Sequence, residues 1–309
     1  MSGASRPALR RPGQAIEAAL WMVAASLVFA VMNAAIRYAA LRLHPFEVAF
    51  FRNLFGLAFL LPWLWQAGLG GLRSGRRWLY GWRALVSLAA MLCSFSALAL
   101  LPFAQAVALS FTTPLFSTIG AALILRETVR ARRWSATIVG FVGVLLMLWP
   151  GLGAGLGAGG GSAFGALLGI TAAAISAIAQ LIVKQLTRTE TPGAIASYMV
   201  LLLVPMSLPP ALAVWDWPAP ALWPWLIAIG GLGTLGHLLY VRAFSLADAS
   251  AVLPYDYVRM PLAALLGWYG FAEVPDGWTM LGSAVIAASA LYIAHRERLQ
   301  ARRTTAPAT

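Results

Sequence analysis

The chain has 309 residues, of which 61% are hydrophobic and 10% charged, and its mean hydropathy is +0.78. This composition excludes a water-soluble globular protein, because a domain of this size could not keep so much apolar surface away from water. The formal net charge of +12 would suit a nucleic-acid-binding protein, but the sequence has no basic stripe with interleaved aromatic residues outside its predicted loops, which excludes that class.

Ten apolar segments follow one another along the chain, and an α-helix needs about 20 such residues to cross the hydrocarbon core of a bilayer. The predicted spans, in chain order, are 17–41, 46–66, 78–101, 103–125, 134–150, 163–186, 193–214, 222–245, 249–271 and 278–295. Lipid offers no hydrogen-bond partner to backbone groups, so each span is predicted to be helical. The first span is longer than the apolar region of a signal peptide, which predicts an uncleaved helix.

The basic residues are concentrated on one side of these spans. Most of the 22 fall in the N-terminal tail, near the ends of the second, fourth and sixth spans, and in the C-terminal tail. The loops on the opposite side carry Arg42 as their only basic residue, together with Asp216, Glu273 and Asp276. Because loops rich in arginine and lysine stay in the cytoplasm, we expect a multi-pass protein of the inner (plasma) membrane with both termini cytoplasmic.

A glycine-rich, uncharged segment, residues 151–162, divides the ten spans into two groups of five and is predicted to be a flexible linker. The predicted organisation is a cytoplasmic tail (1–16), a first five-helix half (17–150), the linker, a second five-helix half (163–295) and a second cytoplasmic tail (296–309).

The two halves carry a weak sequence repeat. In order, the first half contains Pro114, Glu127, Trp134 and Gly140, and the second contains Pro261, Glu273, Trp278 and Gly282 at similar spacings. Each half has an odd number of spans, so related halves must lie in opposite orientations. Inverted repeats are a transporter architecture, with the substrate site near the membrane midplane between the halves.

Residues 101–148, LPFAQAVALSFTTPLFSTIGAALILRETVRARRWSATIVGFVGVLLML, resemble the EamA repeat of the drug/metabolite transporter superfamily. The shared pattern is a Pro-Ala entry, a Thr-Pro break, an apolar run, a glutamate and a closing helix of small residues. Residues 246–295 resemble the second copy, although Ala272-Glu273 replaces the Gly-Glu pair common there. The resemblance implies an all-α membrane protein with ten transmembrane helices, in two inverted five-helix EamA repeats that alternate access.

The expected function is that of a secondary transporter that exports small metabolites such as amino acids, since size and layout are most similar to amino-acid exporters of the YddG type. The family also contains carriers of nucleotide-linked metabolites, riboflavin and drugs, which stay open as alternatives; a lipid flippase and a membrane-embedded enzyme are the other classes. We expect no cofactor and no metal, because the sequence has no GxxxxGK[ST] or HExxH motif and one cysteine, Cys93. The expected partners are a small-molecule substrate and the lipid bilayer, with no nucleic acid, and the expected form is a monomer.

Two charged residues inside the ninth span, Asp256 and Arg259, are three residues apart and can pair on one helix face. A charge at the centre of a span costs about 2.5–3.5 kcal/mol on insertion scales, so it needs a compensating partner. One interpretation is a neutral pair that packs this helix against a neighbour. The other is a site for a zwitterion, with Tyr255 and Tyr257 beside the carboxylate. The residues alone leave both open.

Other polar residues inside spans are candidates for a central cavity. Arg52 and Asn53 lie about two turns from the outer surface, and EamA proteins resemble this chain in having an arginine there, which predicts that Arg52 faces the bundle. The remaining candidates for the cavity wall are Asn33, His237, Trp21 and Trp268. His237 is interpreted either as a packing residue or as a proton relay.

Arg37 and Arg83 lie near the ends of their spans, where a long arginine side chain can reach the headgroups. We expect Arg37 to extend to the outer surface and Arg83 to the cytoplasmic one. Pro114, Pro254 and Pro261 are predicted helix breaks, because a proline inside a span frees a backbone carbonyl.

Cysteine labelling tests the predicted topology. In a Cys93→Ser background, Gly157→Cys should react with an impermeant thiol reagent added outside the cell, whereas Gly75→Cys, in a loop rich in arginine, should not. The reverse labelling pattern would contradict both the orientation and the inverted relation of the two halves.

Overall fold

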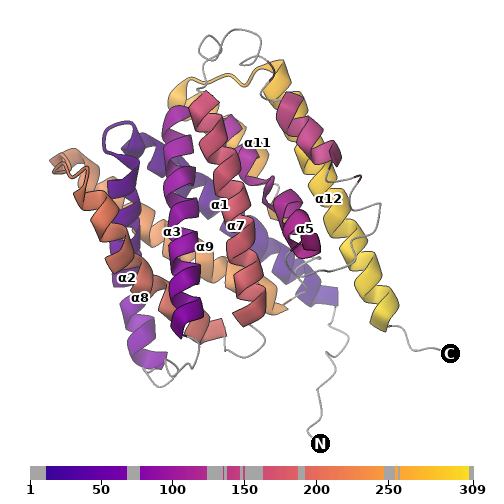
Figure 1. Cartoon of the computed structure of the whole chain (residues 1–309), viewed down its shortest axis with the longest axis horizontal. Helices are drawn as coiled ribbons and strands as arrows, with labels where there is room; N and C mark the ends of the chain where they lie inside the picture. Colours follow the sequence, from indigo (N-terminus) through magenta and orange to yellow (C-terminus); the bar gives the residue numbers. More distant parts are fainter. Residues whose placement is uncertain are drawn as a thin grey trace, which may run out of the picture.

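The computed structural model describes residues 12–67, 77–123, 135, 138–146, 149, 163–186, 192–246, 255–256 and 258–305, and within these the chain is helical, without a β-strand. The helices run beside one another as a bundle (Figure 1). In chain order they are α1 (Pro12–Ala40), α2 (Pro45–Ala67), α3 (Arg77–Leu100), α4 (Phe103–Ser110), α5 (Thr113–Leu123), α7 (Ala163–Leu186), α8 (Pro192–Leu212), the 3₁₀ helix η2 (Pro220–Leu222), α9 (Trp223–Leu246), α11 (Arg259–Phe271) and α12 (Gly277–Thr305).

Five of these helices contain a stretch long and apolar enough to cross a membrane. The stretches are Ile16–Ala40, Pro45–Pro62, Trp78–Leu100, Ala163–Val183 and Pro220–Ala243. They overlap the first, second, third, sixth and eighth predicted spans. The seventh and tenth spans correspond to α8 and α12, whose apolar stretches are shorter, and much of the fifth span and the start of the ninth lie outside the described residues. The count of ten spans therefore stays a prediction.

The fourth predicted span is not one helix, because α4 ends at Ser110 and α5 begins at Thr113. Pro114 in the first turn of α5 has no N–H to donate, so helical hydrogen bonding cannot continue through it. The hydroxyls of Ser110, Thr112 and Thr113 donate to the carbonyl oxygens of residues three positions earlier, at 2.6–2.8 Å. These side chains therefore satisfy backbone groups that lipid could not.

Pro261 resembles this case. It lies in the first turn of α11, directly after a turn at Val258, as Pro114 lies in the first turn of α5. Pro254 lies outside the described residues. At its other end the chain shows a further difference, because α12 continues to Thr305, and most of the predicted C-terminal tail is therefore a continuation of the tenth helix.

The packing of the two halves follows one pattern. α1 packs along α9, α3 packs along α7, and α2 packs against α8 (Figure 1). When the first five predicted spans are exchanged with the second five, the α1–α9 contact becomes the α7–α3 contact. In the same way the α1–α11 contact becomes the α7–α5 contact, and all four contacts are present. A pseudo-two-fold relation between the halves produces this kind of exchange symmetry.

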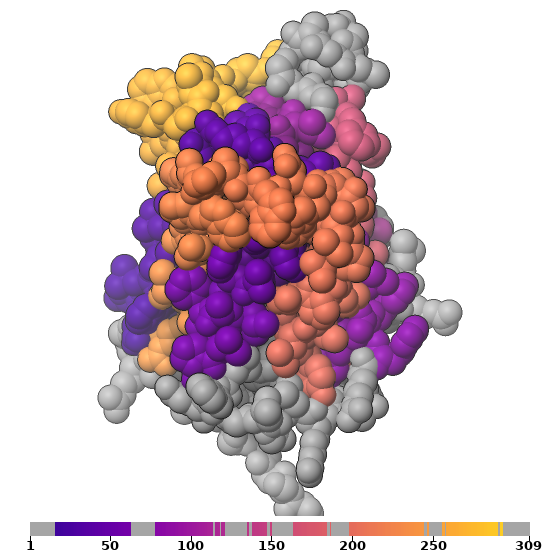
Figure 2. Space-filling view, turned by 90° about the vertical axis from the view of Figure 1, so that its left-hand side faces the viewer, coloured from indigo at the N-terminus to yellow at the C-terminus, as the bar shows by residue number. Residues whose placement is uncertain are grey.

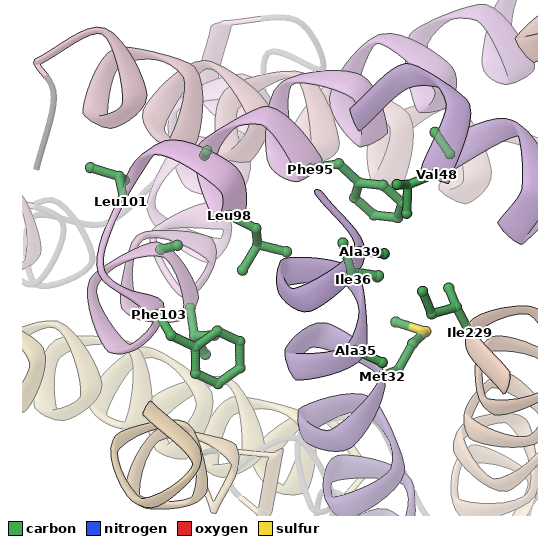
Figure 3. Packing of buried hydrophobic residues seen from close by; sticks show 14 of the residues in the cluster. Met32, Ala35, Ile36, Ala39, Val48, Phe95, Leu98, Leu101, Phe103 and Ile229 are labelled. Atoms are coloured by element: carbon green, nitrogen blue, oxygen red, sulfur yellow. The ribbon is translucent and has the colours of Figure 1, made fainter. Parts of the chain in front are cut away.

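The main hydrophobic cluster lies where α1, α2, α3, α4 and α9 meet (Figure 3). Ile36, Leu101 and Phe103 are almost completely buried in it. Small residues of α1, such as Ala35 and Ala39, allow the neighbouring helices to approach. The cluster therefore joins α9, from the second half, to helices of the first.

The segment between α8 and α9 covers one end of α2. The Trp215 ring lies 5.9 Å from Phe50 and 5.6 Å from Phe51, and Figure 2 shows this part of the chain (orange) lying across α2 (purple). The buried Glu47 side chain accepts a hydrogen bond from the backbone N–H of Asp216. This contact ties the connection to the first turn of α2.

Glycine sets the distance between α2 and α9. A Cβ at Gly230 would lie 2.4 Å from Phe55 Cβ and 2.8 Å from Gly56 N, and backbone atoms cannot move aside as a flexible side chain can. One turn later, Thr234 donates a 3.1 Å hydrogen bond to the Gly56 carbonyl oxygen. The two helices are therefore in backbone contact at this point.

Gly230→Ala should separate α2 from α9 and destabilise the protein by about 1–3 kcal/mol, as overpacking does in other interiors. A thermal unfolding measurement in detergent checks this. Gly81→Ala is the matched control, because a Cβ at Gly81 meets nothing within 4 Å and alanine favours a helix. Equal melting temperatures for the two variants would contradict the close contact at Gly230.

Candidate functional site

Arg52 belongs to α2, and its side chain lies in the interior beside α3 and α9. Its Nη1 donates to Asn53 Oδ1 at 3.1 Å and lies 3.8 Å from Met91 Sδ on α3. A Cβ at Gly233 would be 3.3 Å from Arg52 Nε, so the missing side chain on α9 makes room for the guanidinium group. No carboxylate of the described residues forms an ion pair with Arg52.

Asn53 has a different role from its neighbour. Its side chain is 4% exposed, and its Nδ2 donates to Ser207 Oγ on α8 at 3.3 Å. Ser207 in turn donates to the Leu203 carbonyl oxygen at 2.6 Å. This chain of hydrogen bonds joins α2 to α8 and holds the α2 backbone beside Arg52 in place.

His237 follows Gly230, Gly233 and Thr234 on the face of α9 that is turned toward α2. Its side chain is exposed there. Helical spacing of three and four residues places these positions on one face. His237 therefore stands one helical turn after Gly233, whose missing side chain makes room for Arg52.

Arg83 is half-buried, and its Nε and Nη1 atoms are buried without a hydrogen-bond partner in the described structure. That it extends to the cytoplasmic headgroups stays a prediction. Arg83 stands on α3 about two turns before Met91, the α3 residue that contacts Arg52. We name Arg52, Arg83 and His237 the arginine site.

The predicted pair of Asp256 and Arg259 is present. Arg259 Nη2 lies 3.0 Å from Asp256 Oδ2, and Ser26 Oγ of α1 donates to the other carboxylate oxygen at 2.8 Å. The Arg259 guanidinium lies 4.8 Å from the centre of the Phe111 ring, at the break between α4 and α5. Both carboxylate oxygens are thus engaged, and the geometry favours the interpretation that this pair packs the ninth span against α1.

Tyr240 lies on α9 three residues after His237. Its ring contacts Phe29 of α1, with 6.3 Å between ring centroids. It therefore takes part in the packing of α9 against α1.

Arg37 was expected at the outer headgroups, and this expectation is wrong. The residue is 8% exposed, and its guanidinium forms an ion pair with Glu273. The partner was not visible in the sequence because the two residues are 236 positions apart.

Three other candidate residues belong to α1 or to the start of the ninth predicted span. Tyr255 is 45% exposed, and Tyr257 is outside the described residues. Asn33 is half-buried in α1, one residue after Met32, which reaches Gly233.

The two tryptophan candidates lie at other surfaces of the bundle. Trp21 donates to Glu17 at 3.2 Å and packs on the small cluster of Met22 and Ala243. Trp268 is 53% exposed, and its ring lies 4.9 Å from that of Tyr269, which is 81% exposed, at a tilt of 54°. That Trp268 forms part of a cavity wall stays a prediction.

A separate apolar pocket of about 220 Å³ lies between α4, α11 and α12. Its lining consists of Ala104, Ala108, Met260, Pro261, Ala264, Pro275, Thr279, Met280, Ser283, Ala284 and Ala287. It contains no charged side chain, so the arginine site is the better candidate for a polar ligand. In the described part of the chain, no three His, Cys, Asp or Glu residues are grouped so that they could hold a metal ion.

Comparison with known proteins identifies the family of the chain. Residues 16–149 and 163–294 both match the EamA-like transporter family, and the chain belongs to that family, within the drug/metabolite transporter superfamily. A riboflavin transporter of Vibrio cholerae is 35% identical over 93% of this chain and 96% of its own length. An S-adenosylmethionine uptake transporter of Rickettsia prowazekii is 30% identical, over 90% and 92%. A crystal structure with 19% identity superposes with a TM-score of 0.61, over 96% of this chain and all of the other.

Asp256→Asn or Arg259→Gln alone should each destabilise the protein by about 1–3 kcal/mol, because one change leaves a partly buried charge without its partner. The double variant should recover most of that loss. Melting temperature and transport measured on all three variants check this. A stable single variant that no longer transports, with no recovery in the double variant, would instead favour the zwitterion site.

Proposed function

We propose that the protein is a secondary transporter of a flavin, with riboflavin as the first candidate, that works by alternating access in the inner membrane. In this proposal ten helices form two inverted five-helix repeats, with both termini in the cytoplasm. Two observations support the architecture: the one-sided distribution of basic residues and the exchange symmetry of the helix contacts. The substrate assignment is supported by the arginine site and by the names of relatives.

The observation that carries the proposal is that Arg52 and Arg83 are two interior guanidinium groups that form no ion pair with a carboxylate of the described residues. In a membrane interior, a positive group without a partner is costly, and a ligand that accepts its hydrogen bonds lowers that cost. Guanidinium groups are planar, present several N–H donors and stack on aromatic faces. The isoalloxazine ring of a flavin is planar and has two carbonyl acceptors on one edge, so Arg52 and Arg83 can donate to it while His237 contacts its face or its sugar-alcohol chain.

The relatives support a flavin over the other substrates considered. Two riboflavin transporters, from Vibrio cholerae and Rhizobium johnstonii, are 35% and 32% identical to this chain. S-adenosylmethionine carries a positive sulfonium group, which Arg52 and Arg83 would repel. An amino acid needs a carboxylate for its ammonium group as well as a guanidinium, and both oxygens of Asp256 are already engaged. We therefore propose a flavin as the substrate in place of an exported amino acid.

Arg52→Gln or Arg83→Gln should weaken riboflavin binding about 10–150-fold, because a hydrogen bond to a charged group contributes about 1.5–3 kcal/mol. Quenching of flavin fluorescence in detergent measures binding, and radiolabelled uptake into proteoliposomes measures transport.

Arg242→Gln is the matched control. Arg242 lies on α9 close to His237, but its side chain is 57% exposed and lies 3.8 Å from Glu17, so binding should not change. Wild-type binding in both Arg52→Gln and Arg83→Gln would contradict the site. Protection of the wild-type protein by S-adenosylmethionine but not by riboflavin, in a thermal unfolding experiment, would contradict the substrate.

A further inference from the structure

Arg37 joins three separate parts of the chain at one end of the bundle. Its Nη1 donates to the carbonyl oxygens of Leu98 and Leu101, at the C-terminal end of α3, and its Nη2 pairs with Glu273 Oε1. Glu273 Oε2 accepts a hydrogen bond from the Phe103 N–H at 2.5 Å. We name this set of contacts the Arg37 clasp.

The backbone after α11 holds Glu273 in position for this contact. Ala272 ends α11 in the left-handed conformation, with φ of 54°, and the Glu273 N–H donates back to the Gly267 carbonyl oxygen at 3.0 Å. The Arg37 guanidinium lies 5.3 Å from the centre of the Phe271 ring, which also packs against Phe103. Arginine and glutamate are therefore both held by contacts besides their own ion pair.

The clasp connects the two halves of the protein. Arg37, Leu98, Leu101 and Phe103 belong to the first half, and Glu273 belongs to the second. It lies directly beside the main hydrophobic cluster, in which Leu98, Leu101 and Phe103 take part (Figure 3). By its charge pattern this is the end with few basic loops, where Arg42 and Asp276 also lie.

The hydrogen bonds and the ion pair of the clasp can break and form again. The carbonyls of Leu98 and Leu101 are at the end of α3, where helical partners run out, so they accept hydrogen bonds from outside the helix. Glu273 keeps a side chain that is 24% exposed, so water can reach the carboxylate when the pair opens. An ion pair at such a boundary contributes less than a fully buried one and is easier to break.

We propose that the Arg37 clasp is the gate at this end of the transport path: it closes the path in the conformation seen here and breaks once in every transport cycle. Alternating access requires that one half moves against the other while the substrate site stays between them. The clasp joins the halves at this end together with the contacts of Glu47 and Trp215, and it is the described ion pair among them, so its rupture is the step that releases this end. This inference depends on the membership of the transporter family and is independent of the flavin assignment.

A cysteine-accessibility experiment tests the gate without any substrate. Ala35 is 3% exposed and lies in the cluster beside the clasp, so Ala35→Cys in a Cys93→Ser background should react slowly with an impermeant maleimide in nanodiscs. Adding Glu273→Gln, which removes the negative charge but keeps the size of the side chain, should speed the reaction at least tenfold.

Arg42→Gln is the matched control for this experiment. Arg42 lies at the same end, donates to the Tyr38 carbonyl oxygen at 3.1 Å and stacks over the Tyr38 ring, but forms no ion pair with a described carboxylate. Its loss should leave the labelling rate unchanged. Equal rates in the Glu273→Gln and Arg42→Gln backgrounds would overturn the proposal.

A covalent tether separates a gate from a purely structural contact. Arg37→Cys with Glu273→Cys, joined by a reducible bifunctional thiol reagent, should stop transport while substrate binding persists, and reduction should restore transport. Retained binding shows that the tethered protein is folded. Unchanged transport with the tether complete would overturn the gate. The labelling result stands whether or not riboflavin is the substrate, so failure of the flavin assignment is recognised separately.

Discussion

A charged side chain inside a lipid bilayer is not solvated by bulk water, so the protein or its ligand must provide a hydrogen-bonding or charged partner. This constraint separates the interior arginines into two kinds. Arg37 and Arg259 pair with Glu273 and Asp256. The first pair joins α1 to the chain after α11, and Ser26 of α1 donates to the second. Arg52 and Arg83 have no such carboxylate in the described structure. The first kind organises the bundle, and the second kind is the one that we propose to bind a substrate.

α9 packs closely against both α1 and α2, and its glycines explain why. Gly230 allows contact with the α2 backbone, and a Cβ at Gly236 would lie 2.7 Å from the Phe29 ring of α1. Between them Gly233 admits the Arg52 side chain. A helix with larger residues at these positions would keep α1 and α2 at a distance, and the arginine would lose its place beside His237.

Much of the fold was predictable because hydropathy measures the same free energy that places a helix in lipid. The pairing of Asp256 with Arg259 was predictable too, since residues three apart share a helix face. The contacts of Ser26 and Phe111 with this pair were not, because hydrogen-bond and ring partners far apart in the chain leave no periodic signal. Long arginines near span ends reach either headgroups or interior carboxylates, and composition does not distinguish the two, so the expectation for Arg37 was wrong.

The repeat offers a reason why the clasp lies where it does. Arg37 stands eight residues before Pro45, which begins α2, and Lys184 stands eight residues before Pro192, which begins α8. Glu273 has its sequence counterpart in Glu127, which lies outside the described residues. The sequence therefore has a base near the end of the first predicted helix of each half and an acid after the fourth. In the inverted repeat that we propose, a half that carries both places one acid and one base at each end of the path. One five-helix sequence used twice would then supply the contact that closes either end, as alternating access requires.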